Sequence, residues 1–115
     1  MNILLIVNES PWGSTLANTA LRFARAALEE GMNLRGVYFR GDGVYNALQG
    51  RATDSGAQDL SAAWSAIAGE HGVALMLCSA AATRRLPAAV PGPYREAGLA
   101  ELFEMMSLSD RVVAF

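Results

Sequence analysis

The sequence predicts a single α/β domain in three layers, with a mainly parallel sheet of about four to five strands between helices. Runs of strand character alternate with segments of helical periodicity along the chain, and parallel neighbours need such crossover connections. The run at residues 3–7 is also unbroken and apolar, as expected for a central strand that is covered on both faces. A length of 115 residues is enough for one domain, which would be residues 1–115.

The same patterns place each element in order. The predicted strands are residues 3–7, 34–39, 73–77 and 112–115. The predicted helices are a first one capped by Ser14 and stopped by Gly31, a second from Asp59 to Gly72, a short third from Ser79 to Arg85, and a last one marked by Leu99, Leu102, Phe103 and Met106. Residues 49–58 are polar and predict a mobile loop, and the proline-rich residues 86–93 predict an irregular connector.

Composition excludes several classes of function. The chain is 52% apolar and 17% charged, which is typical of folded globular proteins. Its net charge is −2 and its arginines are scattered, so no nucleic-acid partner is expected. All nine basic residues are arginine, which excludes a Schiff-base lysine and a P-loop lysine. No run approaches the roughly 20 apolar residues of a membrane span, so we expect a cytoplasmic protein without a membrane partner.

The chain contains one cysteine, Cys78, and one histidine, His71. This pair cannot supply a Cys/His metal site or an internal disulfide, and neither a metal nor another cofactor is expected. His71 precedes the third strand whereas Cys78 follows it, so the two lie roughly 20 Å apart. A catalytic Cys/His pair within one subunit is therefore not expected.

Cys78 is nevertheless the leading candidate for a functional residue. A strand that stops there and passes directly into a helix puts the sulfur beside free backbone N–H groups, those of Ser79 and Ala80, which could stabilise a thiolate. Arg84 and Arg85 follow one to two turns later, where either could add positive charge or simply face the solvent. The pattern alone leaves a second interpretation open, since lone cysteines in apolar strands are usually small buried hydrophobes.

Parallel strands deliver their following loops to one edge of a sheet, where ligands commonly bind. Residues 8–13, 40–46 and 78–85 should meet there. The residues expected to line this crevice are Asn8, Trp12, Gly43, Tyr45 and Asn46. Other interpretations remain open: a tight turn at Gly41 and Gly43, a packed loop anchor at Tyr45 and Asn46, and a Trp12 that packs under the first helix.

Several motifs together resemble a known family. They are Gly-Asp-Gly-Val-Tyr-Asn-Ala at 41–47, Trp64 before the third strand, His-Gly-Val-Ala-Leu at 71–75, Cys-Ser-Ala-Ala-Ala-Thr-Arg-Arg at 78–85 and Asp-Arg-Val-Val-Ala-Phe at 110–115. In this order they resemble the DsrE/TusD group (DsrEFH family) of small sulfurtransferases, which implies a flavodoxin-like, DsrEFH-like fold. The resemblance implies that Cys78 carries a sulfane sulfur as a persulfide between sulfur-donor and sulfur-acceptor proteins, in tRNA thiolation or sulfur oxidation.

The resemblance also implies a homo-oligomer or a hetero-hexamer with related subunits. High apolar content, and a last strand that ends at Phe115, likewise suggest apolar surface shared between subunits. The chain departs from the family pattern in residues 86–97, which are shorter and proline-rich, so partner identity stays open. A non-catalytic assembly subunit is the alternative function, and a flavin- or nucleotide-binding module rests on fold alone.

Overall fold

The computed structural model describes residues 1–12, 14–49 and 59–115. Within them, one sheet has the strand order β4-β3-β2-β1-β5, and all its neighbouring strands are parallel. The strands are β1 (Asn2–Val7), β2 (Asn33–Phe39), β3 (Ala74–Cys78), β4 (Tyr94–Ala97) and β5 (Arg111–Ala114). The helices are α1 (Leu16–Glu29), α2 (Leu60–His71), α3 (Ser79–Arg85), α4 (Leu99–Ser107) and the 3-10 helix η1 (Gly41–Ala47). The predicted fold class is confirmed.

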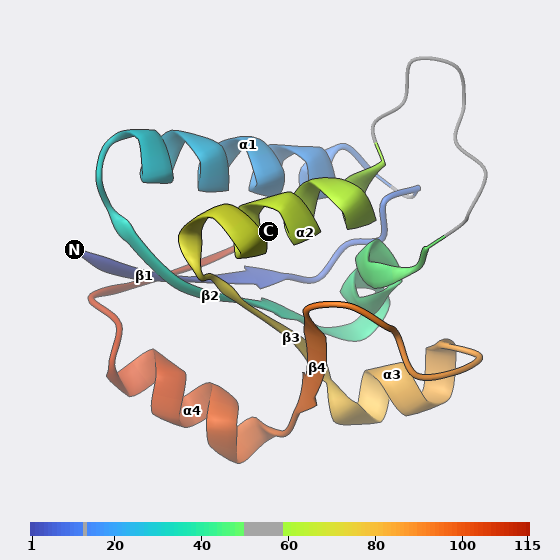
Figure 1. Ribbon diagram of the computed structural model, residues 1–115. Coiled ribbons are helices and arrows are strands. Elements are labelled where there is room, and N and C mark those ends of the chain that lie inside the picture. The colour runs from blue at the N-terminus through green and yellow to red at the C-terminus, as the bar shows by residue number, and fades with distance from the viewer. Residues whose placement is uncertain (13, 50–58) are drawn as a thin grey trace.

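Helices α1 and α2 cover one face of the sheet and α4 covers the other (Figure 1). We call these the first face and the second face. Each face has its own apolar cluster, which follows from the alternation of side chains along buried strands. The cluster on the first face is much the larger and includes most of the buried aromatic side chains. The cluster on the second face has six buried residues, namely Leu4, Ile6, Tyr38, Met76, Ala97 and Leu102.

Helix ends explain where the helices of the first face begin and stop. The Asp59 side chain accepts a hydrogen bond from the amide of Ala62 at 3.2 Å, which caps α2 as predicted. Gly72 ends α2 at a φ of 68°, a left-handed conformation that suits glycine. Helix α1 begins at Leu16 with Thr15 in the N-cap position, and the predicted Ser14 hydroxyl accepts a hydrogen bond from the amide of Leu16 at 3.1 Å.

Two segments have a secondary structure that differs from the prediction. Residues 94–97 form β4, whereas the sequence predicts only a connector throughout residues 86–97. The turn predicted at Gly41 and Gly43, after β2, is part of the 3-10 helix η1. The loop expected at residues 49–58 falls, apart from residue 49, outside the described residues.

The end of the chain after β5 is fixed by contacts with β1 and α1. The amide of Phe115 donates to the carbonyl of Ile6 at 2.8 Å, and its ring packs on Phe23 at a centroid distance of 5.6 Å. Apolar surface is nevertheless exposed at Val112 of β5, and also at Leu99 and Phe103 of α4 and at Leu108. Among the described helices, none is long and apolar enough to span a bilayer.

Candidate functional site

Cys78 lies where the sequence predicts, at the point where a buried strand becomes a helix. It is the last residue of β3 and the N-cap residue of α3, and it is partly buried. Its side chain packs against the apolar clusters of both faces. The thiol therefore sits at the carboxyl edge of the sheet, between its two sides.

The first amides of α3 are adjacent to this thiol. The Cys78 side chain makes no capping hydrogen bond to the helix, so these donors do not bind the sulfur in this conformation. Ser79 is partly buried and Ala80 is exposed. Since first-turn N–H groups have no acceptor within a helix, they are available to another acceptor placed at the helix start.

Tyr38 is a neighbour of Cys78 that sequence reasoning missed. Its hydroxyl is buried and donates a hydrogen bond to the carbonyl of Ala97 at 3.0 Å. Ala97 on β4 is the register partner of Cys78 on β3, so this hydroxyl reaches the backbone directly opposite the cysteine. Burial raises the pKa of Tyr38 to about 12, and the nearby Cys78 acts in the same direction. The phenol therefore keeps its proton at neutral pH.

The two arginines of α3 have different surroundings. Arg85 donates from Nε to the Asp42 carboxylate at 2.8 Å, which ties α3 to η1. Arg84 is exposed, and no ion pair or hydrogen bond joins it to the described residues. The positive charge that reaches the Tyr38 hydroxyl is that of Arg40, which slightly offsets the raised pKa of Tyr38. Arg40 was not among the predicted site residues.

The segments after β1 and β2 meet as the sheet topology predicts. The Asn46 side chain is buried and donates from Nδ2 to the carbonyls of Glu9 at 2.9 Å and Gly43 at 2.8 Å. A Cβ at Gly43 would collide with the carbonyl oxygen of Val7, so this position admits only glycine. Asn46 therefore acts here as a loop anchor, and Gly43 allows the close approach of the two loops.

The remaining crevice candidates lie at the surface of the same edge. The rings of Trp12 and Tyr45 pack together with centroids 5.4 Å apart. Trp12 is 55% exposed, so it lies over the edge and does not pack under α1. Asn8 accepts a hydrogen bond from Arg40 at 3.5 Å. These side chains form a packed layer across the ends of β1 and β2.

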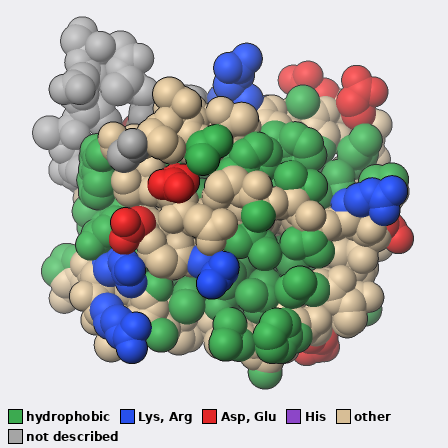
Figure 2. All heavy atoms as spheres, turned by 180° about the vertical axis from the view of Figure 1, so that it is seen from behind, with side chains coloured by type: hydrophobic (Ala, Val, Ile, Leu, Met, Phe, Trp, Pro, Cys, Tyr) green, Lys and Arg blue, Asp and Glu red, His purple; other side chains and the backbone are tan. Residues whose placement is uncertain are grey.

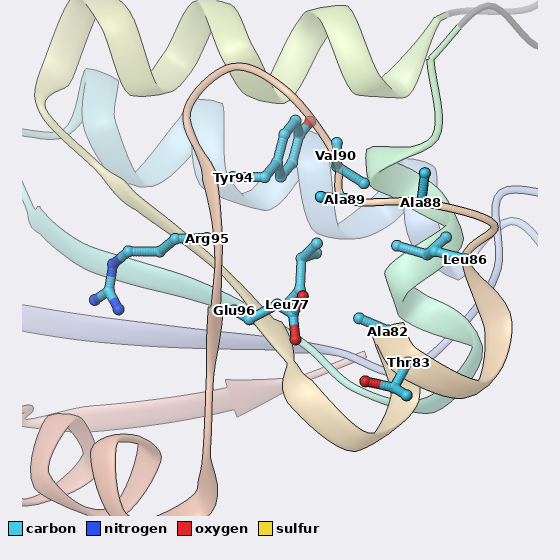
Figure 3. A pocket seen from close by; sticks show the side chains of 10 residues that line it. All are labelled: Leu77, Ala82, Thr83, Leu86, Ala88, Ala89, Val90, Tyr94, Arg95 and Glu96. Atoms are coloured by element: carbon cyan, nitrogen blue, oxygen red, sulfur yellow. The ribbon is translucent and has the colours of Figure 1, made fainter.

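A cavity of about 360 Å³ lies between α3, β4 and the connector of residues 86–93 (Figure 3). Leu77, Thr83 and Tyr94 are among its lining residues. Neither Cys78 nor any of the predicted crevice-lining residues lines it. The cavity thus adjoins the thiol along the chain but is not the crevice that the sheet topology predicts.

His71 ends α2 and is exposed, with Glu70 as its neighbour at 3.9 Å. The length of β3 separates it from Cys78, as predicted. Across residues 1–12, 14–49 and 59–115, no group of three or more His, Cys, Asp or Glu side chains could hold a metal ion.

Comparison with known proteins agrees with this architecture. The crystal structure of the ychN protein from E. coli superposes with a TM-score of 0.87, covering 100% of this chain and 99% of that chain at 24% identity, which establishes the same fold. Two proteins named sulfurtransferase TusD match 100% of this chain and 100% of their own length. The one from Cronobacter sakazakii is 40% identical over 128 aligned positions, and the one from Salmonella newport is 38% identical.

The aligned positions outnumber the 115 residues of this chain, so both relatives carry residues that it lacks. The model of the DsrE/DsrF-like family matches residues 1–115, the whole of the sequence. The chain therefore belongs to the DsrE/DsrF-like family.

Proposed function

We propose that this protein is a sulfurtransferase that carries sulfane sulfur as a persulfide on Cys78. The observation that carries the proposal is the position of the only cysteine, partly buried at the carboxyl end of β3 and next to the start of α3. The full-length relatives named sulfurtransferase TusD support the same activity.

The chemistry needs only the thiolate of Cys78. That anion attacks the outer sulfur of a donor persulfide and forms a new S–S bond. The S–S bond of the donor breaks, and its electron pair leaves on the donor thiolate. In the second step an acceptor thiolate attacks the outer sulfur on Cys78, and the electron pair returns to the Cys78 sulfur. No oxidant, reductant, metal or cofactor takes part.

The absence of a second cysteine favours transfer between proteins. A persulfide on Cys78 has no other thiol within its own chain to attack it. The sulfur must therefore leave to a thiol of another molecule. We propose a donor protein and an acceptor protein as partners, serving tRNA thiolation or sulfur oxidation in a reducing compartment such as the cytoplasm, where the thiol stays free.

The residues around the thiol have distinct parts in this proposal. The free amides of Ser79 and Ala80 are donors for the outer sulfur, which extends beyond the Cys78 Sγ. Arg84 is exposed and available to an acidic partner surface, whereas Arg85 holds α3 on η1 through Asp42. The packed layer that includes Trp12 and Tyr45 forms the neighbouring part of the docking surface.

Assembly into a homo-oligomer or a hetero-hexamer with related subunits is part of the proposal. In the view from behind, hydrophobic side chains are exposed across the middle and lower part of the molecule (Figure 2). The large exposed apolar residues of α4 and its surroundings are Leu99, Phe103, Met106, Leu108 and Val112. Exposed apolar surface of this kind is typical of protein contacts.

Mass spectrometry tests the carrier role directly. Incubation with a sulfur-charged donor should add the mass of one sulfur atom to the tryptic peptide that contains Cys78, and Cys78→Ser should abolish the gain. If the wild-type peptide gains no sulfur while a known carrier does so under the same conditions, the carrier role is wrong.

A non-catalytic assembly subunit is the second candidate, favoured by the packing of Cys78 against both apolar clusters. It predicts that iodoacetamide labels Cys78 no faster than a buried control thiol. Fast labelling together with sulfur loading would exclude it.

A further inference from the structure

The position of Tyr38 follows from the alternation along two neighbouring strands. Met76 of β3 lies in the cluster of the second face, and Cys78, two residues later, continues that side of the strand. Tyr38 of β2 pairs with Met76 in register and lies in the same cluster. Its side chain passes β3 and bonds to Ala97 of β4. The hydroxyl is thereby brought to the backbone opposite Cys78, whose side chain packs against the same cluster.

The hydroxyl has a single proton and donates it in a hydrogen bond to the carbonyl of Ala97 at 3.0 Å. In this arrangement the Tyr38 oxygen can only accept a hydrogen bond from the Cys78 S–H. Once Cys78 has lost its proton, the sulfur becomes an acceptor with a full negative charge. A charged acceptor forms a stronger hydrogen bond than a neutral carbonyl does. Rotation about the phenol C–O bond is enough to turn the proton from Ala97 to the sulfur.

We propose that the Tyr38 hydroxyl is the hydrogen-bond donor to the Cys78 sulfur whenever that sulfur is a thiolate, which makes Tyr38 a catalytic residue of this sulfurtransferase. The inference rests on the proposed function of Cys78. In the step that releases sulfur, the acceptor forms its S–S bond, the bond to Cys78 breaks, and the electron pair returns to the Cys78 sulfur. Tyr38 donates to that sulfur as the charge appears and keeps its own proton throughout.

Two charged groups face this pair. Arg40 extends from the end of β2, and its positive charge favours anionic forms nearby. Glu101 of α4 acts in the opposite sense, but it forms an ion pair with Arg95 of β4. Hydrogen bonding to Arg95 lowers the pKa of Glu101. Glu101 therefore keeps its charge across the neutral range, which leaves Tyr38 as the group that the substitution below changes.

The test compares two substitutions that each remove one buried tyrosine hydroxyl. Tyr38→Phe removes the donor to Ala97, and Tyr94→Phe removes a hydroxyl that donates to the carbonyl of Ser61 at 2.8 Å on the first face. The measurement is the rate of Cys78 alkylation by iodoacetamide between pH 5 and pH 10. We expect Tyr38→Phe to move the midpoint of this profile up by about one pH unit and to lower the rate at neutral pH about tenfold. Tyr94→Phe should leave the profile unchanged.

An unchanged midpoint in Tyr38→Phe, or an equal shift in Tyr94→Phe, would overturn the proposal. A second measurement loads the wild type and both variants with glutathione persulfide and follows release of the sulfur to cyanide as thiocyanate. We expect slower release only in Tyr38→Phe. Failure of every variant to load would count against the persulfide function, while the alkylation profile would still decide the role of Tyr38.

Discussion

The two faces of the sheet differ in how completely they are covered. On the first face, α1 and α2 enclose a large core that contains Trp64 and Phe39, both fully buried. On the second face, the nine-residue α4 contributes one buried residue, Leu102, to a cluster of six. Cys78 touches both clusters, and its tyrosine neighbour belongs to the second one. The first face therefore buries most of the apolar core, and Cys78 lies where the two clusters meet, with Tyr38 on the less covered face.

The largest expected loss of stability comes from a substitution in the core of the first face. Trp64→Ala should lower the free energy of unfolding by about 3 to 5 kcal/mol, because it leaves a large cavity in the buried core of α2. Phe103→Ala on the second face is the control. Phe103 is 61% exposed, and its loss should change the free energy by no more than about 0.5 kcal/mol. Urea denaturation measures both, and equal losses would contradict the comparison.

Each face contains a buried tyrosine that should make the fold less stable at alkaline pH. Burial raises the pKa of Tyr38 on the second face from 10.0 to about 12, and burial also raises the pKa of Tyr94 on the first face. A raised pKa means that the fold favours the neutral phenol, so this contribution is complete below pH 10 and is lost as pH rises toward 12. For Tyr38 it amounts to up to about 2 to 3 kcal/mol.

Tyr38→Phe and Tyr94→Phe should each reduce the alkaline loss of stability, measured as urea midpoints from pH 8 to pH 12. If both variants keep the full loss, burial of the phenols is not its cause.

The smallest effect on folding is expected at the exposed side of α4. Phe103→Ser should leave the free energy of unfolding within about 0.5 kcal/mol of the wild type, since the side chain is exposed in the single chain. If copies or related subunits cover this face, the same change should lower the assembly mass seen by light scattering. Ala100→Ser, also exposed on α4, is the matched control and should keep the mass. An unchanged mass in Phe103→Ser would remove α4 from the assembly contacts.

Sequence patterns were sufficient where an element is determined by its own residues. β1 is five buried residues in a row after Asn2, and α3 was predicted with its observed bounds because β3 passes straight into it. β4 is different, since two of its four residues, Arg95 and Glu96, are charged and exposed, and prolines precede it. Its strand conformation comes from pairing with β3, which is a tertiary effect that local propensity does not include.

The same distinction holds for the candidate site. The place of Cys78 followed from one strand and the helix after it. The position of Tyr38 near Cys78 could not be predicted in this way, because the Tyr38 hydroxyl donates to Ala97 of β4, a strand that the sequence pattern does not predict. The pairing of Arg85 with Asp42 likewise depends on how α3 packs on η1. Such contacts depend on how separate elements pack together, and local sequence patterns do not contain that information.

The four-residue β4 has a consequence for the dynamics of the thiol. β4 forms one edge of the sheet, and its last register pair joins Ala97 to Cys78. Short edge strands open at a lower free energy than the core does, without unfolding of the rest. Each such opening would break the hydrogen bond between Tyr38 and Ala97 and move Ala97 away from Cys78. Amide hydrogen exchange in β4 should therefore measure how often the strand beside Cys78 opens in the absence of a partner protein.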